Sequence, residues 1–320
     1  PDGLLSFALA APPSEWLFTG GLENHSSLVN EICRRHRMLG NNGPSNLYRA
    51  RKPSFCSDFA EMCGFAHPET LHACPPDDRR WLIKRTHSSG GLGVRWAKPG
   101  EAPSQGEILQ EWIAGTPGSA AFLSAIDGVH FLFATEQLSG ASFLGAPEFH
   151  YAGNILAPPP DEAKLRRLGG ELISFFGLIG LIGVDYIHRD GQLWLLEVNP
   201  RYTASMELWE RAAGRSLIEH HVRACRCEST PSSSELALTT PPALAKGILY
   251  ATSDGLLTDA LADHLWERRA EFDLADLPSH GGPVHKGHPV LTIFAAGASH
   301  EDAMRQLEEK AAALRALGVP

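Results

Sequence analysis

Short apolar runs alternate along this chain with longer stretches in which apolar residues recur at helical spacing. Apolar runs bounded by turn residues predict four strands in the middle of the sequence: Trp81–Lys84, Ile108–Gly115, Phe122–Ile126 and Val129–Thr135. Apolar residues three and four positions apart, with charged residues between them, predict three amphipathic helices: Arg49–Gly64, Asp161–Phe176 and Ser299–Leu317. Strands and helices are therefore mixed through the whole chain.

The first 50 residues have the pattern of a small layered region. Glu15–Thr19 predicts a buried strand, and Leu28–Met38 carries apolar residues at helical spacing. Because parallel strands need cover on both faces, one strand and one helix predict a reduced, Rossmann-like layer. Ligands collect at the carboxyl ends of strands in open α/β sheets. Glu23, Asn24 and His25 are therefore either substrate contacts or part of a glycine turn capped by Asn24, and we favour the turn.

Composition narrows the class of protein. The 320 residues carry a formal net charge of −9, which argues against a nucleic-acid or anionic membrane partner. The longest apolar run, Leu172–Val184, is too short to span a bilayer, and no signal peptide is visible. The six cysteines form no CxxC pair, and Cys225 and Cys227 lie too close for a usual structural disulfide. We therefore expect thiols in a reducing cytoplasm. Because the chain begins with Pro, we also expect that its natural start is missing.

The stretch Gly183–Arg201 predicts a β-hairpin with oxygen ligands near its open end. Its strands are Val184–His188 and Leu193–Val198. Residues two apart on a strand share a face, so Glu197 and Asn199 point the same way.

The length of the turn decides whether Asp185 shares that face. A three-residue loop, Arg189-Asp190-Gly191, places Asp185 with Glu197 and Asn199, whereas a two-residue turn at Asp190-Gly191 places it on the opposite face. With the longer loop, three apolar side chains fill the buried face: Trp194, Leu196 and Val198. Two carboxylates and one amide oxygen suit Mg²⁺, a hard cation that often shares its ligands with phosphates. The alternative is an ordinary amphipathic hairpin that ends in acids.

A glycine-rich loop, Thr86–Val94, follows the first of the central strands. Its glycines bring backbone N–H groups close to phosphate oxygens, and its serines add hydroxyl donors: Gly90, Gly91, Gly93, Ser88 and Ser89. Lys84 places an ammonium at the base of the loop. The loop matches neither the Walker A motif nor G-x-G-x-x-G, and its alternative interpretation is a simple hairpin.

The spacing D-x11-E-V-N-P-R at Asp185–Arg201, together with the glycine loop and the segment Ile108–Gly115 upstream, resembles the ATP-grasp superfamily over residues 45 to 320. The resemblance implies an α+β, ATP-grasp fold in which two α+β subdomains sandwich ATP, preceded by a truncated Rossmann-like layer. It divides the chain into a partial Rossmann-like region (1–70), a glycine-loop subdomain (71–115), a metal-binding catalytic subdomain (116–225) and a C-terminal subdomain (226–320).

The resemblance also assigns the nucleotide site. The backbone of Glu111, Trp112 and Ile113 is expected to pair with the adenine edge, with Glu111 near the adenine or the ribose. The alternative is an alternating strand on which Glu111 is exposed. ATP and Mg²⁺, or Mn²⁺ in its place, are the implied cofactors, and the metal ligands are Asp185, Glu197 and Asn199.

Two cations are the implied catalytic residues. Lys84 and Arg201 neutralise charge as the γ-phosphoryl group moves, and catalysis consists mainly of positioning and electrostatic stabilisation. The alternative for Arg201 is a structural ion pair with Glu207 or Glu210.

The implied activity is a carbon–nitrogen ligase. It joins a small carboxylate to an amine through an acyl phosphate, forms ADP, and belongs to the carboligase-like group that acts in amino-acid or cofactor biosynthesis. A homodimer is possible under this resemblance. Glu136 and Asn154 are weak substrate candidates. The alternatives are a biotin-carboxylase-like enzyme that forms carboxyphosphate and a nucleotide-binding protein without turnover.

The last hundred residues begin with a Ser/Thr/Pro-rich stretch, Cys227–Pro242, which predicts a mobile surface loop. A helix at Leu257–Trp266 and a strand at Val290–Ala295 follow it. This part resembles the C-terminal subdomain of biotin-carboxylase-type and purine-ligase ATP-grasp proteins. Three histidines lie in its loops, either as a metal cluster or, as we favour, as solvated side chains: His280, His285 and His288.

Overall fold

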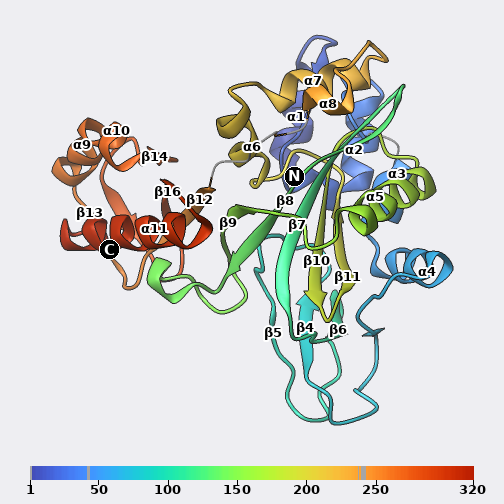
Figure 1. Ribbon diagram of the computed structural model, residues 1–320, viewed down its shortest axis with the longest axis horizontal. Coiled ribbons are helices and arrows are strands. Elements are labelled where there is room, and N and C mark those ends of the chain that lie inside the picture. Colours follow the sequence, from blue (N-terminus) through green and yellow to red (C-terminus); the bar gives the residue numbers. More distant parts are fainter. Residues whose placement is uncertain (1, 42–43, 237, 239–242) are drawn as a thin grey trace. The chain divides into compact units, whose positions relative to one another are not determined.

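The structure is a computed structural model that describes residues 2–41, 44–236, 238 and 243–320, and its helices and strands are labelled in Figure 1. It divides into two compact units. The first contains residues 1–89, 93–134 and 158–238, and the second contains residues 90–92, 135–157 and 239–320. Helices and strands occur in both, as the predicted α+β class requires. The division into four segments stays a prediction.

The first unit is built on long antiparallel strands. They are β7 (Thr116–Ala125), β10 (Gly180–Arg189) and β11 (Gln192–Asn199), and β8 (Gly128–Ser139) begins beside them, in the order β11-β10-β7-β8. The turn between β7 and β8 falls at Ile126-Asp127, one residue earlier than the sequence indicated.

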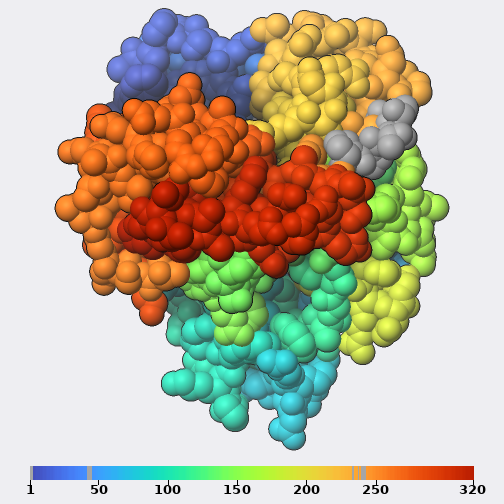
Figure 2. Space-filling view, turned by 60° about the vertical axis from the view of Figure 1, so that its left-hand side comes forward, coloured from blue at the N-terminus to red at the C-terminus, as the bar shows by residue number. Residues whose placement is uncertain are grey.

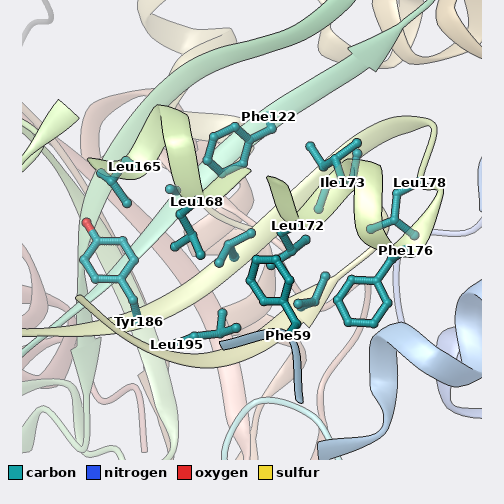
Figure 3. Packing of buried hydrophobic residues seen from close by; sticks show 14 of the residues in the cluster. Phe59, Phe122, Leu165, Leu168, Leu172, Ile173, Phe176, Leu178, Tyr186 and Leu195 are labelled. Carbon is teal, nitrogen blue, oxygen red and sulfur yellow. The ribbon is translucent and has the colours of Figure 1, made fainter. Parts of the chain in front are cut away.

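Helix α5 (Glu162–Phe176) covers one face of these strands. Its ends are those the sequence predicts, because the Asp161 side chain accepts a hydrogen bond from the Lys164 N–H and Gly177 closes the helix in the left-handed conformation. Leu165, Leu168, Leu172 and Phe176 repeat at three and four residues and form a buried stripe. Figure 3 shows this stripe packed with Phe59, Phe122 and Leu195, which come from elements before and after it in the chain.

Two shorter helices complete this layer. The single helix expected at 49–64 is two helices, α3 (Pro44–Arg51) and α4 (Pro53–Cys63). Pro53 lacks an N–H and pushes Lys52 into extended backbone, with φ −89° and ψ 120°, so the helix breaks there. Gly64 closes α4 with φ 71°, as its sequence position predicted.

The N-terminal layer contains one strand more than expected. Strand β1 (Glu15–Trp16) pairs in parallel with β2 (Arg37–Met38). The short 3-10 helix η1 (Leu22–Asn24) and helix α2 (Ser26–Cys33) connect them, and α1 (Asp2–Ala10) precedes them. The expected helix over 28–38 ends at Cys33, and the buried Met38 belongs to β2. The glycine turn after β1 therefore stands at the carboxyl end of a small parallel pair.

A second, smaller sheet in the first unit carries the glycine-loop strands. Its order is β3-β6-β4-β5, from strands Thr70–Leu71, Glu107–Glu111, Trp81–Arg85 and Arg95–Trp96. Trp81, Ile83 and Leu109 form its core. The first unit also contains α6 (Met206–Ala213), α7 (Leu217–Cys225) and α8 (Ser233–Leu236).

The second unit has its own strands and core. Strands β9 (Tyr151–Ala157), β12 (Ala243–Tyr250), β16 (Pro289–Gly297) and β14 (Leu274–Ala275) are neighbours in that order, and β13 (Gly255–Leu257) pairs with β15 (Gly282–Val284). The helices are η2 (Ser142–Leu144), α9 (Asp259–Glu267), α10 (Arg269–Phe272) and α11 (His300–Ala316). Figure 2 shows α11, in red, along the surface of this unit beside the orange α9 and α10.

Helix α11 is capped by Ser299, the first residue of the range that the sequence predicts for this helix. Ser299 Oγ accepts from the Asp302 N–H at 3.2 Å, and Asp302 Oδ2 accepts in return from the Ala298 N–H at 2.9 Å. Its buried face, which includes Leu307 and Leu314, joins the core of the unit.

The Ser/Thr/Pro-rich stretch differs from the expected mobile loop. Its described part contains α8, and Leu236 is fully buried with its carbonyl accepting from Trp209 Nε1 at 3.2 Å. Residues 237 and 239–242 lie outside the described residues. A single apolar residue, Leu236, is enough to pack this otherwise polar stretch against the rest of the unit.

The described residues contain neither a cluster of metal-binding side chains nor a membrane-spanning helix. No group of three His, Cys, Asp or Glu side chains in this part of the chain is arranged to hold a metal ion, so the histidines at 280, 285 and 288 form no such cluster. Over the same residues, we find no helix with both the length and the apolar character needed to cross a bilayer. All six cysteines are described, and none forms a disulfide.

The packing of α5 predicts opposite effects for two adjacent glycines. A Cβ on Gly169 would lie 2.1 Å from Cε1 of the buried Phe122 ring, whereas a Cβ on Gly170 meets nothing within 4 Å. Gly170→Ala should stabilise the protein by up to about 1 kcal/mol through helix propensity. Gly169→Ala should destabilise it by about 1–3 kcal/mol through overpacking. Urea unfolding of both variants measures this, and equal effects would show that α5 does not press on Phe122 as described.

Candidate functional site

The hairpin of β10 and β11 ends in a two-residue turn. Arg189 pairs with Gln192, so Asp190 and Gly191 form the turn, with φ 49° and 74°. Two positive φ angles define a type I′ turn, which matches the twist of antiparallel strands and which Asp-Gly favours. Of the two loop lengths that the sequence left open, the structure therefore has the two-residue turn.

A β-bulge nevertheless brings the two carboxylates together. The register shifts between Asp185 and Tyr186, because Tyr186 pairs with Leu195 while Asp185 pairs with Glu197. Leu196 is the extra residue. Directly opposed residues of an antiparallel pair share a face, so Asp185 and Glu197 face the same side.

The bulge also changes which side chains of β11 are buried. Leu193, Leu195 and Val198 lie in the core, whereas Trp194 and Leu196 are only partly buried. The prediction that Trp194 and Leu196 join Val198 in the buried face is wrong, because the inward phase of the strand skips one residue at the bulge.

The Asn199 amide lies beside the carboxylates, with its nitrogen toward Asp185 and its oxygen toward two arginines. Its Nδ2 donates to Asp185 Oδ2 at 3.0 Å. Its Oδ1 accepts from Arg51 Nη1 at 3.0 Å and from Arg201 Nη2 at 3.4 Å. The three residues predicted from the motif as metal ligands are thus adjacent, but the amide oxygen of Asn199 faces two guanidinium groups.

Arg51 is a site residue that the sequence interpretation missed. It is the last residue of α3, and its side chain is only 10% exposed. Its Nη1 donates to Glu197 Oε1 at 2.5 Å and to the Val198 carbonyl at 2.9 Å, and its Nε donates to Asn24 Oδ1 at 3.0 Å. No local signal marks it, because its partners on the hairpin lie about 146 positions away in the chain.

Arg201 is paired with the N-terminal layer. Its Nε donates to Glu23 Oε1 at 2.6 Å, and Glu23 is 1% exposed. The considered pair with Glu207 or Glu210 does not describe it, because Glu210 accepts from the Tyr202 hydroxyl and the Leu217 N–H. Glu23 and Asn24, on η1, contact the two arginines of the site. The expected glycine turn is present, but the prediction that Asn24 caps it is wrong.

Lys84 lies on β4, where it has a neutral hydrogen-bond partner and negatively charged neighbours. Its Nζ donates to Gln110 Oε1 at 2.5 Å. Burial lowers the pKa of Lys84, and the negative charges of Glu197 and Asp185 act in the opposite direction. The Lys84 ammonium, on the small sheet, is therefore close enough to the hairpin carboxylates for their charges to act on its pKa.

The two carboxylates titrate differently. Burial, and then the charge of Glu197, raise the pKa of Asp185 to about 6, although a hydrogen bond from Ser119 acts against this rise. Burial would also raise the pKa of Glu197, but the adjacent Arg51 outweighs it and the pKa is lowered. Two partly buried carboxylates on directly opposed residues favour an added cation.

The predicted glycine loop is divided between the units. Ser88 Oγ donates to the Arg85 carbonyl at 2.9 Å, Ser89 is exposed, and Gly93 lies against the Arg85 side chain. Gly90 and Gly91 belong to the second unit. There the Gly90 carbonyl accepts from the Tyr151 N–H at 3.0 Å, and Gly91, at φ 78°, lies where a Cβ would be 1.9 Å from the Phe149 carbonyl oxygen.

The predicted adenine-binding segment uses two of its N–H groups within the protein. The Glu111 N–H donates to the Glu69 carbonyl and the Trp112 N–H to the Arg80 carbonyl, both at 2.8 Å. The Glu111 carboxylate lies 3.2 Å from Arg79, so it is not simply exposed. Within the described residues, no backbone acceptor is recorded for the N–H of the buried Ile113.

The two substrate candidates of the second unit are a buried and an exposed side chain. Asn154 is fully buried and donates to Thr135 Oγ1 at 2.8 Å, which gives it a structural role in its sheet. Glu136 lies 3.8 Å from His300 at the surface of the unit.

The donor set of the hairpin fits a hard divalent cation at one position. Asp185 and Glu197 supply carboxylate oxygens on one face, which is the chemistry that Mg²⁺ or Mn²⁺ prefers. Asn199 fits less well, since both guanidinium groups contact its oxygen.

Comparisons with known proteins find matches in both sequence and fold. Residues 52–205 match the family model described as an ATP-grasp domain. The chain is 24% identical over 190 aligned residues to an uncharacterized protein of Methanocaldococcus jannaschii. The aligned region covers 59% of this chain and 42% of that relative. This chain therefore spans less than half the length of that curated relative.

Solved structures share the fold at low sequence identity. Carboxyaminoimidazole ribonucleotide synthase of Aspergillus clavatus, solved with ATP, superposes with a TM-score of 0.74 at 10% identity over 99% of this chain and 85% of that one. Biotin carboxylase of Campylobacter jejuni superposes with a TM-score of 0.71 at 10% identity, and the match covers 100% of this chain and 82% of that one. These two structures confirm the predicted fold class.

Because the pKa of Asp185 is raised, replacing this residue with a neutral one should stabilise the folded protein, and the gain should depend on pH. A carboxyl group whose folded pKa is about 6 contributes stability below its unfolded pKa of about 4, and this contribution is lost as the pH rises through 6. Asp185→Asn should therefore raise the free energy of unfolding at pH 8 by on the order of 1–2 kcal/mol, and much less at pH 4. Thermal unfolding at both pH values without nucleotide measures the difference. Asp190→Asn, exposed in the turn of the same hairpin, is the control, and an equal pH-dependent gain there would contradict the assignment.

Proposed function

Because this chain is an ATP-grasp superfamily protein, we propose that it is an ATP-dependent, ADP-forming ligase that joins a small carboxylate to an amine through an acyl phosphate. The observation that carries the proposal is the pairing of Asp185 with Glu197, with Lys84 and Arg201 as the neighbouring cations. This arrangement fits a site for a triphosphate and a divalent cation.

The proposed reaction has two steps. A carboxylate oxygen of the first substrate attacks the γ-phosphorus of ATP, the bond to the β-phosphate oxygen breaks, and ADP leaves. The amine then attacks the carbonyl carbon of the acyl phosphate, the carbon–oxygen bond breaks, phosphate leaves, and the amine proton passes to solvent. Lys84 and Arg201 stabilise the negative charge that moves in the first step.

Asp185 and Glu197 would hold Mg²⁺, or Mn²⁺ in its place, and the ion would supply positive charge to a bound triphosphate. Ser88, Ser89 and Gly93 of the glycine loop belong to the same unit as the hairpin, and in this proposal they lie against the phosphates and help to exclude water from the acyl phosphate. The adenine lies against the segment 111–113, where the Ile113 N–H serves as donor.

The substrate classes are small molecules, and we place the reaction in amino-acid or cofactor biosynthesis. The second candidate is carboxylation through carboxyphosphate, which the fold shared with carboxyaminoimidazole ribonucleotide synthase and biotin carboxylase favours. Bicarbonate would then replace the carboxylate substrate.

Phosphate release distinguishes these activities. With ATP, Mg²⁺ and pools of carboxylates and amines, we expect phosphate release that requires both pools. Release that requires bicarbonate but no other carboxylate favours the carboxylation. Glu197→Gln should lower the rate at least about tenfold, since it removes a charge from the site, while ATP binding persists. The same rate in this variant, or no turnover with any pool, would contradict the proposed ligase.

Lys84 should contribute directly to nucleotide affinity. Lys84→Ala removes a charge-assisted hydrogen bond to phosphate, which is worth about 1.5–3 kcal/mol, so the Kd for ATP should rise about tenfold or more. Lys98→Ala removes an exposed lysine from the strand–loop region of the same sheet and is the matched control. Titration with a fluorescent ATP analogue measures both, and an unchanged Kd for Lys84→Ala would remove Lys84 from the phosphate site.

A further inference from the structure

The Arg51 guanidinium contacts the side-chain oxygens of both Glu197 and Asn199, which could otherwise hold a second divalent cation between them. We propose that Arg51 acts as a built-in cation of the nucleotide site, so that the site takes one divalent cation rather than two. This inference rests on the proposed function, because it concerns the same hairpin and the same triphosphate.

Arg51 is held from several directions at once. Its Nη1 contacts Glu197 Oε1, the Val198 carbonyl and Asn199 Oδ1 at 2.5, 2.9 and 3.0 Å, and its Nε contacts Asn24 Oδ1 at 3.0 Å. The side chain is 10% exposed. Moving it aside for a metal ion would leave the oxygens of Asn24 and Val198 without this donor, and unmade hydrogen bonds of buried groups are costly.

The orientation of the Asn199 amide supports the same conclusion. Its nitrogen donates to Asp185, and its oxygen accepts from Arg51 and Arg201. A flipped amide would turn its NH₂ group toward two guanidinium donors and its oxygen toward a carboxylate, so the hydrogen-bond network fixes the observed orientation. Arg51 and Arg201 therefore use the two lone pairs that a second metal ion would need.

One nitrogen of Arg51 remains for the nucleotide. Within the described residues, no acceptor is recorded for its Nη2, although Nε and Nη1 together have four. A guanidinium that neutralises Glu197 on one side and donates to a phosphate oxygen on the other performs the bridging of a metal ion. The first divalent cation keeps its position at Asp185 and Glu197.

Arg49 provides a matched control on the same helix. Its guanidinium lies 5.1 Å from the Phe175 ring centre and 5.6 Å from that of Phe55, and it donates to the Phe175 carbonyl at 3.2 Å. Replacing Arg49 removes an equal charge from α3 without removing a contact to the hairpin carboxylates.

Bound Mn²⁺ tests the inference. The protein is dialysed to equilibrium against Mn²⁺ and a non-hydrolysable ATP analogue, and bound Mn²⁺ is measured by electron paramagnetic resonance and bound nucleotide by absorbance. We expect one Mn²⁺ per bound nucleotide for the native protein, Arg49→Gln and Arg51→Lys. Arg51→Gln should bind two, a twofold rise.

Each other outcome overturns a stated claim. Two Mn²⁺ per nucleotide in the native protein, or one in a folded Arg51→Gln, overturns the role of Arg51 and leaves the proposed ligase intact. Nucleotide that fails to bind to the native protein overturns the proposed function itself and, with it, this inference. If Arg51→Gln does not fold, the counts for the native protein and Arg51→Lys still decide between one ion and two.

Discussion

Two partly buried carboxylates, Asp185 and Glu197, face the same side of one antiparallel pair, and their repulsion is the constraint on which the site depends. The bulge at Leu196 makes Asp185 and Glu197 direct neighbours, and burial then strengthens their interaction. Three cationic side chains offset this repulsion: Arg51, Lys84 and Arg201. The site is therefore best understood as a set of positive charges assembled around a fixed negative pair.

Those positive charges come from separate parts of the first unit. Arg51 ends helix α3, Arg201 follows the hairpin, and Lys84 comes from the small sheet. The short helix η1 then links two of them, because its consecutive residues Glu23 and Asn24 accept from Arg201 and Arg51. The N-terminal layer thus takes part in the site although its strands have only two residues each.

Rigid packing beneath the hairpin makes such a site possible. Tyr186, Leu195 and Val198 point into the same core as the buried stripe of α5, so the face that carries the carboxylates is supported from behind. This packing fixes the positions of the carboxylates relative to their charged neighbours. Phosphoryl transfer requires charges that are held in place in this way before the reaction.

The sequence by itself determined the features that depend on neighbours in the chain. The caps at Asp161 and Ser299, the helix end at Gly64 and the Asp-Gly turn follow from local turn chemistry, and the motif from Asp185 to Arg201 indicated the ATP-grasp fold. The tertiary structure decided the rest. A bulge leaves no local mark when both possible phases of a strand are apolar, as at Leu193–Val198. The contacts of Arg51 and Glu23 join residues separated by 146 and 178 positions, and only the packed layers bring such residues together.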